Sequence, residues 1–518
     1  MLNAILEGIG KTADEWTPLA VDSRSHEGLA WGIYRLALRG KSNQITNALA
    51  ASLLGPKSND ATRLAAAHYL ARGAQGIESL FGMISRAALT DSLVEVRMAA
   101  ALALRKIPTD SSLLVIESIL ASDEDYRVKV NAMRALSAFR YERVENHLTE
   151  GLASKYPAIR IAASEIVLSL ANEKAWVQLA NLAEQVQDWR AQAKVYQAVL
   201  KQKDLPFIID EIKSLYDKAT DPYHRAALLS SLQEAPSAYP FVFDQLIKAD
   251  TPVIRSSAAA ALVAMNESPR FKASMKSKFA DMYRRAISTG DPAVIGTVCG
   301  ALANPSLGYR EIISDASFLI EAKNRLSLPR DNEALQPLER AIAHFEGLPV
   351  ANVLNEYNHP IDWALARKIP SNATAIIRTS RGHIVIRLFV DEAPGSVANF
   401  VHLARTGYFD KKFFHRVVPN FVIQAGCNRG DGWGSEDYSI RSEFSERKYR
   451  TGSVGMASAG KDTEGTQWFI THSPTPHLDG RYNIFAEVDQ GMEVVHQIQV
   501  GDRILGVDLP FLEENDTQ

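Results

Sequence analysis

The sequence predicts a multidomain protein, in which an all-α solenoid of stacked helix pairs precedes an antiparallel β-barrel that carries two helices. Three observations support this prediction. The chain of 518 residues is long enough for more than one domain. Residues 1–345 are rich in Ala and Leu at helical spacing and contain a repeated pattern. After residue 373 the apolar spacing shifts towards period two, in short runs separated by turn residues.

A basic residue recurs at the same place in each copy of the helical repeat, every 30 to 35 residues. These residues are Arg63, Arg97, Lys129, Arg160, Arg190, Arg225 and Arg255. Asp or turn residues precede several copies and are start signals for a first helix, and a second helix follows, as from Ser111. A period of this size indicates stacked units that share a core. We expect the repeated basic residues to be exposed or inter-repeat structural charges rather than sites.

The repeat, with a first helix of the form D-x-x-V-R-x-x-A-x-x-A-L, resembles HEAT repeats. This resemblance implies a protein-binding surface along the array. Nucleic-acid binding is not expected, because residues 1–350 hold 40 Lys and Arg against 39 Asp and Glu, and a surface that follows phosphates needs a basic excess. A basic stretch at residues 270–285 is interpreted as a solvated helix face.

Residues 346–372 contain Gly and three prolines without a sustained period, and they are predicted to be a linker. The following segment, residues 374–389, predicts two strands joined by a turn. A helix is expected from Ser396, closed by Gly407. A run of short strands and a second helix, "GMEVVHQI", complete a pattern typical of an antiparallel barrel. The short strands are "KFFHRVV", "FVIQAG", "GSVGMAS", "TQWFITH", "NIFAEV" and "DRILGVDL".

The segment "FFHRVVPNFVIQAG", residues 413–426, reads as strand, turn and strand, yet it carries two polar residues between apolar ones. Burying Arg416 and Gln424 without partners would cost several kcal/mol. Val422 and Gln424 are two residues apart and therefore share a strand face. The segment by itself leaves open what these two polar groups face.

Residues 373–509 resemble a cyclophilin, a peptidyl-prolyl cis-trans isomerase, in four blocks that follow in family order, with spacings like those of the short bacterial members. The blocks are "APGSVANFVHLARTGYFD", "FFHRVVPNFVIQAG", "GSVGMASAGKDTEGTQWFIT" and "HLDGRYNIFAEV". The resemblance implies that the chain is an isomerase. The predicted domains are therefore a HEAT-like solenoid at 1–345, the linker at 346–372, the isomerase at 373–509 and an acidic tail at 510–518.

The resemblance implies that Arg416, Phe421, Val422 and Gln424 line one open groove, so that the polar groups face substrate rather than the core. It also implies a catalytic set, Arg416, Phe421 and Gln424, and no cofactor. The implied substrate-binding residues are Val422, Ala457, Ser458, Gln467, Phe469, His477, Leu478 and Tyr482. His477, Tyr482 and Ser458 stand where the best-known eukaryotic members have Trp, His and Asn. The loss of that Trp implies that binding of cyclosporin-type ligands is weak at most.

Other chemistries are not favoured. Cys299 and Cys427 are the only cysteines, so neither a disulfide framework nor a cysteine-based metal site is expected. The segment "GMASAGKD" has Asp462 in place of the Ser or Thr of a phosphate loop, and it runs into a strand. His415, His472 and His477 lack a metal-ligand spacing. No apolar run reaches 18 residues, so no membrane span is expected.

The first 16 residues read as an amphipathic helix rather than a signal peptide. The given chain is therefore expected to be cytoplasmic, or periplasmic or envelope-bound in a bacterium if the natural chain begins upstream. Expected partners are proline-containing peptides and unfolded or partly folded protein clients. The predicted function is isomerisation of X-Pro bonds in clients held by the solenoid, assisting their folding. The alternatives are a non-catalytic scaffold that binds proline segments and a chaperone.

Overall fold

The computed structural model describes residues 23–350, 355 and 357–513. The chain forms two compact units, divided between Leu170 and Ala171. The division falls inside the helical array, so the second unit contains the later helices together with the sheet. The helix expected at residues 1–16 lies outside the described residues, as do parts of the expected linker and tail.

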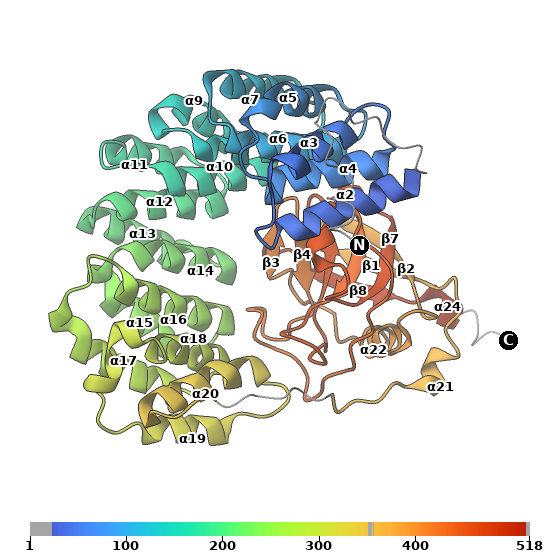
Figure 1. Ribbon diagram of the computed structural model, residues 1–518. Coiled ribbons are helices and arrows are strands. Elements are labelled where there is room, and N and C mark those ends of the chain that lie inside the picture. The colour runs from blue at the N-terminus through green and yellow to red at the C-terminus, as the bar shows by residue number, and fades with distance from the viewer. Residues whose placement is uncertain (1–22, 351–354, 356, 514–518) are drawn as a thin grey trace. The chain divides into compact units, whose positions relative to one another are not determined.

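The first unit is a stack of helix pairs in which α4, α6, α8 and α10 follow one another as neighbours (Figure 1). Small Ala side chains on these helices are almost fully buried, which lets neighbouring helices approach closely and share one core. Side chains at several N-caps, such as Asn59 and Asp125, accept hydrogen bonds from the first turn. The helices are α2 (Ser23–Ala37), α3 (Gln44–Leu53), α4 (Asp60–His68), α5 (Phe81–Thr90), α6 (Val94–Ala103), α7 (Asp110–Ser122), α8 (Tyr126–Ala135), α9 (Tyr141–Leu152) and α10 (Pro157–Leu170).

The second unit continues the same architecture, with α12, α14, α16 and α18 as successive neighbours. Asp188, Asp221 and Asp291 cap the N-termini of three of these helices, and proline follows at the first helical position in α14, α16 and α18. The helices are α11 (Trp176–Gln185), α12 (Trp189–Gln202), α13 (Pro206–Lys218), α14 (Pro222–Ser231), α15 (Tyr239–Lys248), α16 (Pro252–Glu267), α17 (Lys276–Ile287), α18 (Pro292–Leu302), α19 (Ser317–Arg325) and α20 (Asn332–Glu346).

Repeated arginines tie each helix pair to the next. Arg63 donates through Nε to Asp91, and Arg97 donates in the same way to Asp123, both at 2.9 Å. Each of these arginines also donates to a backbone carbonyl in the loop before its own helix. The expectation that they are inter-repeat structural charges is confirmed for these two positions.

Two other basic residues of the array differ from what the sequence predicts for them. Arg190 donates through Nε to the carbonyl of Val500 at 3.1 Å, far along the chain in the sheet region. Arg270, in the stretch interpreted as a solvated face, donates to the carbonyls of Leu200 and Glu234 at 2.6 and 3.1 Å. Those carbonyls lie at helix ends and need donors, which explains why this guanidinium is not left to solvent.

The sheet region is one curled, eight-stranded antiparallel sheet with the order β3-β4-β6-β5-β7-β2-β1-β8 (Figure 1). Its inner face packs on α22 (Pro394–Arg405) and encloses a core that includes Phe400, Phe414 and Trp468. The strands are β1 (Thr374–Thr379), β2 (Gly382–Leu388), β3 (Arg416–Val418), β4 (Val422–Ala425), β5 (Ser453–Met456), β6 (Trp468–Thr471), β7 (Ile484–Gln490) and β8 (Ile504–Asp508). Short helices α21 (Trp363–Ala366), α23 (Met492–Val495) and α24 (Pro510–Glu513) accompany them.

The two edges of this sheet are joined by the segment that leads into β3. Lys411 and Phe414 donate backbone hydrogen bonds to the carbonyls of Ile504 and Asp502, each at 2.9 Å. Ile504 donates in return to Lys412 at 2.8 Å. The edges of the curled sheet are therefore bridged, as an antiparallel barrel requires.

No helix within the described residues is long and apolar enough to cross a membrane. The same part of the chain contains no group of three or more His, Cys, Asp or Glu side chains arranged to hold a metal ion.

Candidate active site

The register of β3, β4 and β6 places three predicted site residues in one row across the sheet. Arg416 is paired with Gln424, and Gln424 is paired with Phe469. Directly paired residues of antiparallel strands project from the same face. The row therefore presents a guanidinium, a carboxamide and an aromatic ring side by side, from residues that are up to 53 positions apart in the chain.

Arg416 is exposed, at the open end of this row. Its Nη1 donates to Oε1 of Gln424 at 3.3 Å, and its guanidinium carbon lies 5.6 Å from the ring centre of Phe421. Among the described residues no carboxylate forms an ion pair with it. The guanidinium is thus held by neutral partners, with donors left for a substrate.

Gln424 and Gln467 form the polar floor beside the guanidinium. Nε2 of Gln424 donates to Oε1 of Gln467 at 3.0 Å. Nε2 of Gln467 then donates to the carbonyls of Gly432 and Gly434 at 2.8 and 2.9 Å. Arg416 is therefore the first member of a continuous chain of hydrogen bonds that ends on the backbone of a nearby loop.

A cluster of apolar side chains lies next to the polar floor, and we name it the apolar hollow for the role that we propose for it below. It is built from six buried residues, against which Phe421, Ala457 and Tyr482 pack at the rim. The six are Phe389, Val422, Tyr449, Phe469, Leu478 and Ile484. Tyr449 stacks beneath Phe469 at 5.6 Å between ring centres, and its hydroxyl donates to the carbonyl of Asn483. Apolar side chains therefore lie next to a charged donor.

The other predicted residues surround this hollow. His477 stacks on Phe421 with 5.4 Å between ring centres and an interplanar angle of 25°. The amide of Ala457 donates to the carbonyl of Gln467 at 2.9 Å, which fixes the end of β5 beside β6. Ser458 follows, half-buried, and its side chain makes no hydrogen bond within the described part of the chain. The structure thus brings the predicted residues together and leaves Ser458 at the margin.

A family model described as cyclophilin type peptidyl-prolyl cis-trans isomerase/CLD matches residues 374–508, and a HEAT repeats model matches residues 82–169. A peptidyl-prolyl cis-trans isomerase of Synechococcus elongatus is 43% identical over 135 residues, which cover 26% of this chain and 93% of the relative. The chain belongs to the cyclophilin-type peptidyl-prolyl cis-trans isomerases. It is an isomerase of this type, preceded by a helical region of HEAT type.

Other relatives match the same cyclophilin region. Peptidyl-prolyl cis-trans isomerase B of Bacillus subtilis is 44% identical over 121 residues, covering 23% of this chain and 85% of the relative. The peptidyl-prolyl cis-trans isomerase of Helicobacter pylori is 39% identical over 144 residues, covering 27% and 88%. A solved cyclophilin type isomerase of Cryptosporidium parvum is 31% identical, covers 26% of this chain and 96% of its own, and gives a TM-score of 0.25.

His415 precedes the guanidinium in the cyclophilin domain and is a neutral residue at physiological pH. Desolvation of its ring is the largest effect and lowers its pKa to about 4. The nearby Arg416 lowers the pKa further, whereas Asp431 opposes the shift. A second positive charge beside Arg416 is thereby avoided at neutral pH.

Sequence reasoning did not single out the loop that supports the polar floor. We call residues 427–435 the site loop, since the carbonyls of Gly432 and Gly434 hold Gln467. Asp431 organises it by accepting from the backbone of Trp433 at 3.0 Å and from Arg429 at 2.8 Å. The glycine-rich segment "NRGDGWG" indicates a turn, but only the fold places this segment beside the site.

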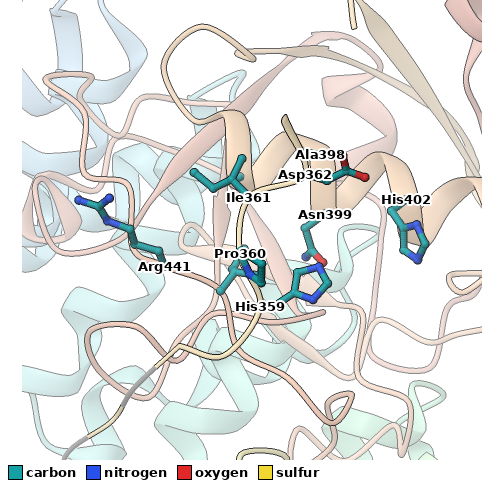
Figure 2. Close-up of a pocket in the computed structure, with 10 residues that line it drawn as sticks. His359, Pro360, Ile361, Asp362, Ala398, Asn399, His402 and Arg441 are labelled. Atoms are coloured by element: carbon teal, nitrogen blue, oxygen red, sulfur yellow. The ribbon is translucent and has the colours of Figure 1, made fainter. Parts of the chain in front are cut away.

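A cavity of about 280 Å³ lies elsewhere on the cyclophilin domain, against α22 (Figure 2). Figure 2 shows Arg441 and His402 at its two ends and His359 and Pro360 near Asn399. The amide of Asn399 is already hydrogen-bonded, to the carbonyl of Gly465 and from the hydroxyl of Tyr438. None of the predicted site residues lines this cavity, so we do not assign the isomerase chemistry to it.

Proposed function

We propose that Arg416, Phe421 and Gln424 catalyse cis-trans isomerisation of X-Pro bonds in protein clients, and that the HEAT-type array recruits those clients and so assists their folding. The residues of the apolar hollow would hold the prolyl ring and its neighbours. We further propose the domain limits 1–345 for the array and 373–509 for the isomerase, with a linker between them and an acidic tail after residue 509.

The row of Arg416, Gln424 and Phe469 carries this proposal. Resonance keeps the X-Pro amide planar, with a barrier of ~18–20 kcal/mol. As the bond twists, the prolyl nitrogen loses conjugation and regains a lone pair. A guanidinium at the rim of a ring-sized hollow can donate to that lone pair only in the twisted state, which is selective binding of the transition state. Arg suits this role because it stays charged and its donors are rigidly arranged.

The required acceleration exceeds what one hydrogen bond supplies. Shortening an event of ~100 s to ~1 ms needs about 7 kcal/mol, whereas one charge-assisted hydrogen bond contributes ~1.5–3 kcal/mol. The remainder must come from holding the substrate in place. The apolar hollow with Phe469 and Leu478, and the carboxamide of Gln424 for the peptide backbone, supply that grip.

The proposal is tested by measuring isomerisation of a proline-containing test peptide by the full chain. Arg416→Ala should reduce kcat/KM by about tenfold to a hundredfold, the value of one charge-assisted hydrogen bond. Binding of the peptide should fall much less, since the apolar hollow is intact. Equal rates for the wild type and Arg416→Ala would refute the assigned role of the guanidinium, and binding without turnover by the wild type would favour the scaffold alternative.

The role of the array is tested separately with Arg416→Ala as the form with weakened catalysis. If the array recruits clients, this variant should suppress aggregation of an unfolded protein as well as the wild type does, while its acceleration of proline-limited refolding falls about tenfold to a hundredfold. Loss of both effects together would indicate that clients bind only at the cyclophilin groove.

A further inference from the structure

The cyclophilin domain contacts the helical array at the N-terminal ends of several helices. The hydroxyl of Tyr223, in the first turn of α14, donates to the carbonyl of Gly430 at 2.7 Å. Its ring meets Phe413 edge to face, with 5.2 Å between centres. Arg190, in the first turn of α12, donates to the carbonyl of Val500. Residues in the first turns of two successive helices, α12 and α14, therefore bind the isomerase region.

Asp291, at the N-terminus of α18, binds the site loop through both of its carboxylate oxygens. Its Oδ1 and Oδ2 lie 2.8 and 3.0 Å from Nη2 of Arg429, and its side chain is only 2% exposed. Oδ1 also caps the helix by accepting from the amides of Ala293 and Val294. Arg255, the repeated arginine of α16, forms an ion pair with Oδ2 at 3.2 Å. Asp291 therefore forms an ion pair with the preceding helix pair of the array, as Asp91 and Asp123 do, and in addition one with a guanidinium of the cyclophilin domain.

Arg429 links Asp291 to a second carboxylate within the site loop. It contacts Asp431, whose side chain is 2% exposed, at 2.8 Å. Two buried carboxylates are thus matched by two guanidiniums, those of Arg429 and Arg255, an arrangement that fixes geometry because buried charges must stay paired. Removal of one of the four groups would leave one charge unmatched.

A glycine on α18, Gly296, accommodates Trp433 of the site loop. A Cβ at Gly296 would lie 2.5 Å from Cζ3 of Trp433 and 2.7 Å from Cη2. The indole therefore packs directly on the helix backbone. On the same helix, a Cβ at Gly300 would meet no atom within 4 Å. Glycine is needed at residue 296 by this contact and not by the helix, in which it is unfavourable.

We propose that Asp291 and Gly296 of the helical array are positioning residues of the isomerase. Asp291 holds the site loop through Arg429, and Gly296 admits Trp433. The loop carbonyls of Gly432 and Gly434 orient Gln467, and Gln467 orients Gln424 and through it Arg416. The array is then a structural part of the active site as well as a client-binding surface. This inference rests on the proposed function of Arg416 and Gln424.

The electrostatic half of the inference is tested with Asp291→Asn in the full chain. The amide oxygen can still cap α18, since Asn is as good an N-cap as Asp, so the change removes mainly the charge that holds Arg429. Asp123→Asn is the matched control: Asp123 accepts from Arg97 in the same kind of inter-repeat ion pair but has no partner in the site loop. Only the first variant should lower kcat.

The packing half is tested with Gly296→Ala, which adds one methyl group under Trp433 and no charge. Gly300→Ala, on the same helix, is the control for the accompanying gain in helix propensity. Incorporated 5-fluorotryptophan gives a ¹⁹F signal of Trp433, assigned with Trp433→Phe. That signal should shift in Gly296→Ala and Asp291→Asn, and it should keep its position in both controls.

For both test variants we expect kcat to fall about three- to tenfold, the worth of one hydrogen bond. KM should change less than twofold, because the loop contributes no residue to the apolar hollow. Wild-type kcat in both variants, a rise in kcat, or an equal fall in the controls would each overturn the inference. An inactive wild type would instead refute the proposed function, and the inference would fall with it.

Discussion

The hydrogen bond between Gln424 and Gln467 should control how well Arg416 is oriented, and Gln467→Leu removes it. Leu has nearly the volume of Gln, so the change introduces little cavity or strain. Gln467 loses three hydrogen bonds: one from Gln424 at 3.0 Å and two to the carbonyls of Gly432 and Gly434 at 2.8 and 2.9 Å. The bonds to the loop and the bond to Gln424 have different consequences.

The two loop bonds affect local stability, and the bond to Gln424 affects the reaction. Each hydrogen bond contributes about 0.5–1.5 kcal/mol net, so the loop should lose roughly 1–3 kcal/mol of local stability. For the reaction only the orientation of Gln424 and Arg416 matters. Loss of one such bond should raise the activation free energy by ~1–1.5 kcal/mol, which lowers kcat/KM about five- to thirteenfold.

The assay is a double-mutant cycle on isomerisation of a test peptide, with Gln424→Leu, Gln467→Leu and the pair. Residues that act through one hydrogen bond should couple by about 1 kcal/mol. Gln490→Leu, at an exposed strand end, controls for the added apolar surface. Additive effects in the cycle, or a Gln467→Leu rate within twofold of the wild type, would refute the idea that orientation reaches Arg416 through Gln467.

Two further changes test residues that lie beside the predicted site, His415 and Gly455. The pKa of His415 is lowered to about 4 in the folded protein from an ordinary value of ~6.5, so the unfolded state binds the proton more readily. The contribution of His415 to stability should be fully present above pH ~6.5 and should decrease as the pH falls to about 4, by about 3 kcal/mol at most. Urea unfolding of His415→Gln should lack this part of the pH dependence that the wild type shows. Gly455→Ala would place a Cβ 2.2 Å from the hydroxyl of Tyr449 and 2.7 Å from Cζ of Phe469. We expect a stability loss of ~1–3 kcal/mol and a higher KM, because Phe469 is pushed towards the apolar hollow. A KM equal to that of the reference variant Gly300→Ala would contradict this packing.

Much of the fold was predictable because its signals are local. Helix pairs are set by apolar spacing, by capping residues such as Asn59 and Asp221, and by the repeat period, all within about 35 residues. Strands were located by alternation and turns, although β3 (Arg416–Val418) and α23 (Met492–Val495) are shorter than their apolar runs. The ends of β3 are set by its pairing with β4, which local periodicity does not encode.

The site was predicted less completely than the fold. The resemblance supplied Arg416, Gln424 and the apolar residues, and the alternation within β4 indicated that Val422 and Gln424 share a face. Neither the resemblance nor the alternation indicated that Tyr449 stacks on Phe469, that His415 is neutral or that the site loop holds Gln467. These depend on burial and on backbone carbonyls, which have no residue signature.

The sequence alone determined the two architectures, the family of the isomerase and the residue types of its groove, because each follows from short-range spacing or from contiguous motifs. Only the tertiary structure decided that Arg416, Gln424 and Phe469 stand in one row, since strand register is set by pairing across long loops. It also decided that Asp291 meets Arg429, 138 residues further along the chain. Such a contact follows from how buried charges find partners when two parts of a chain pack together, and no local pattern records it.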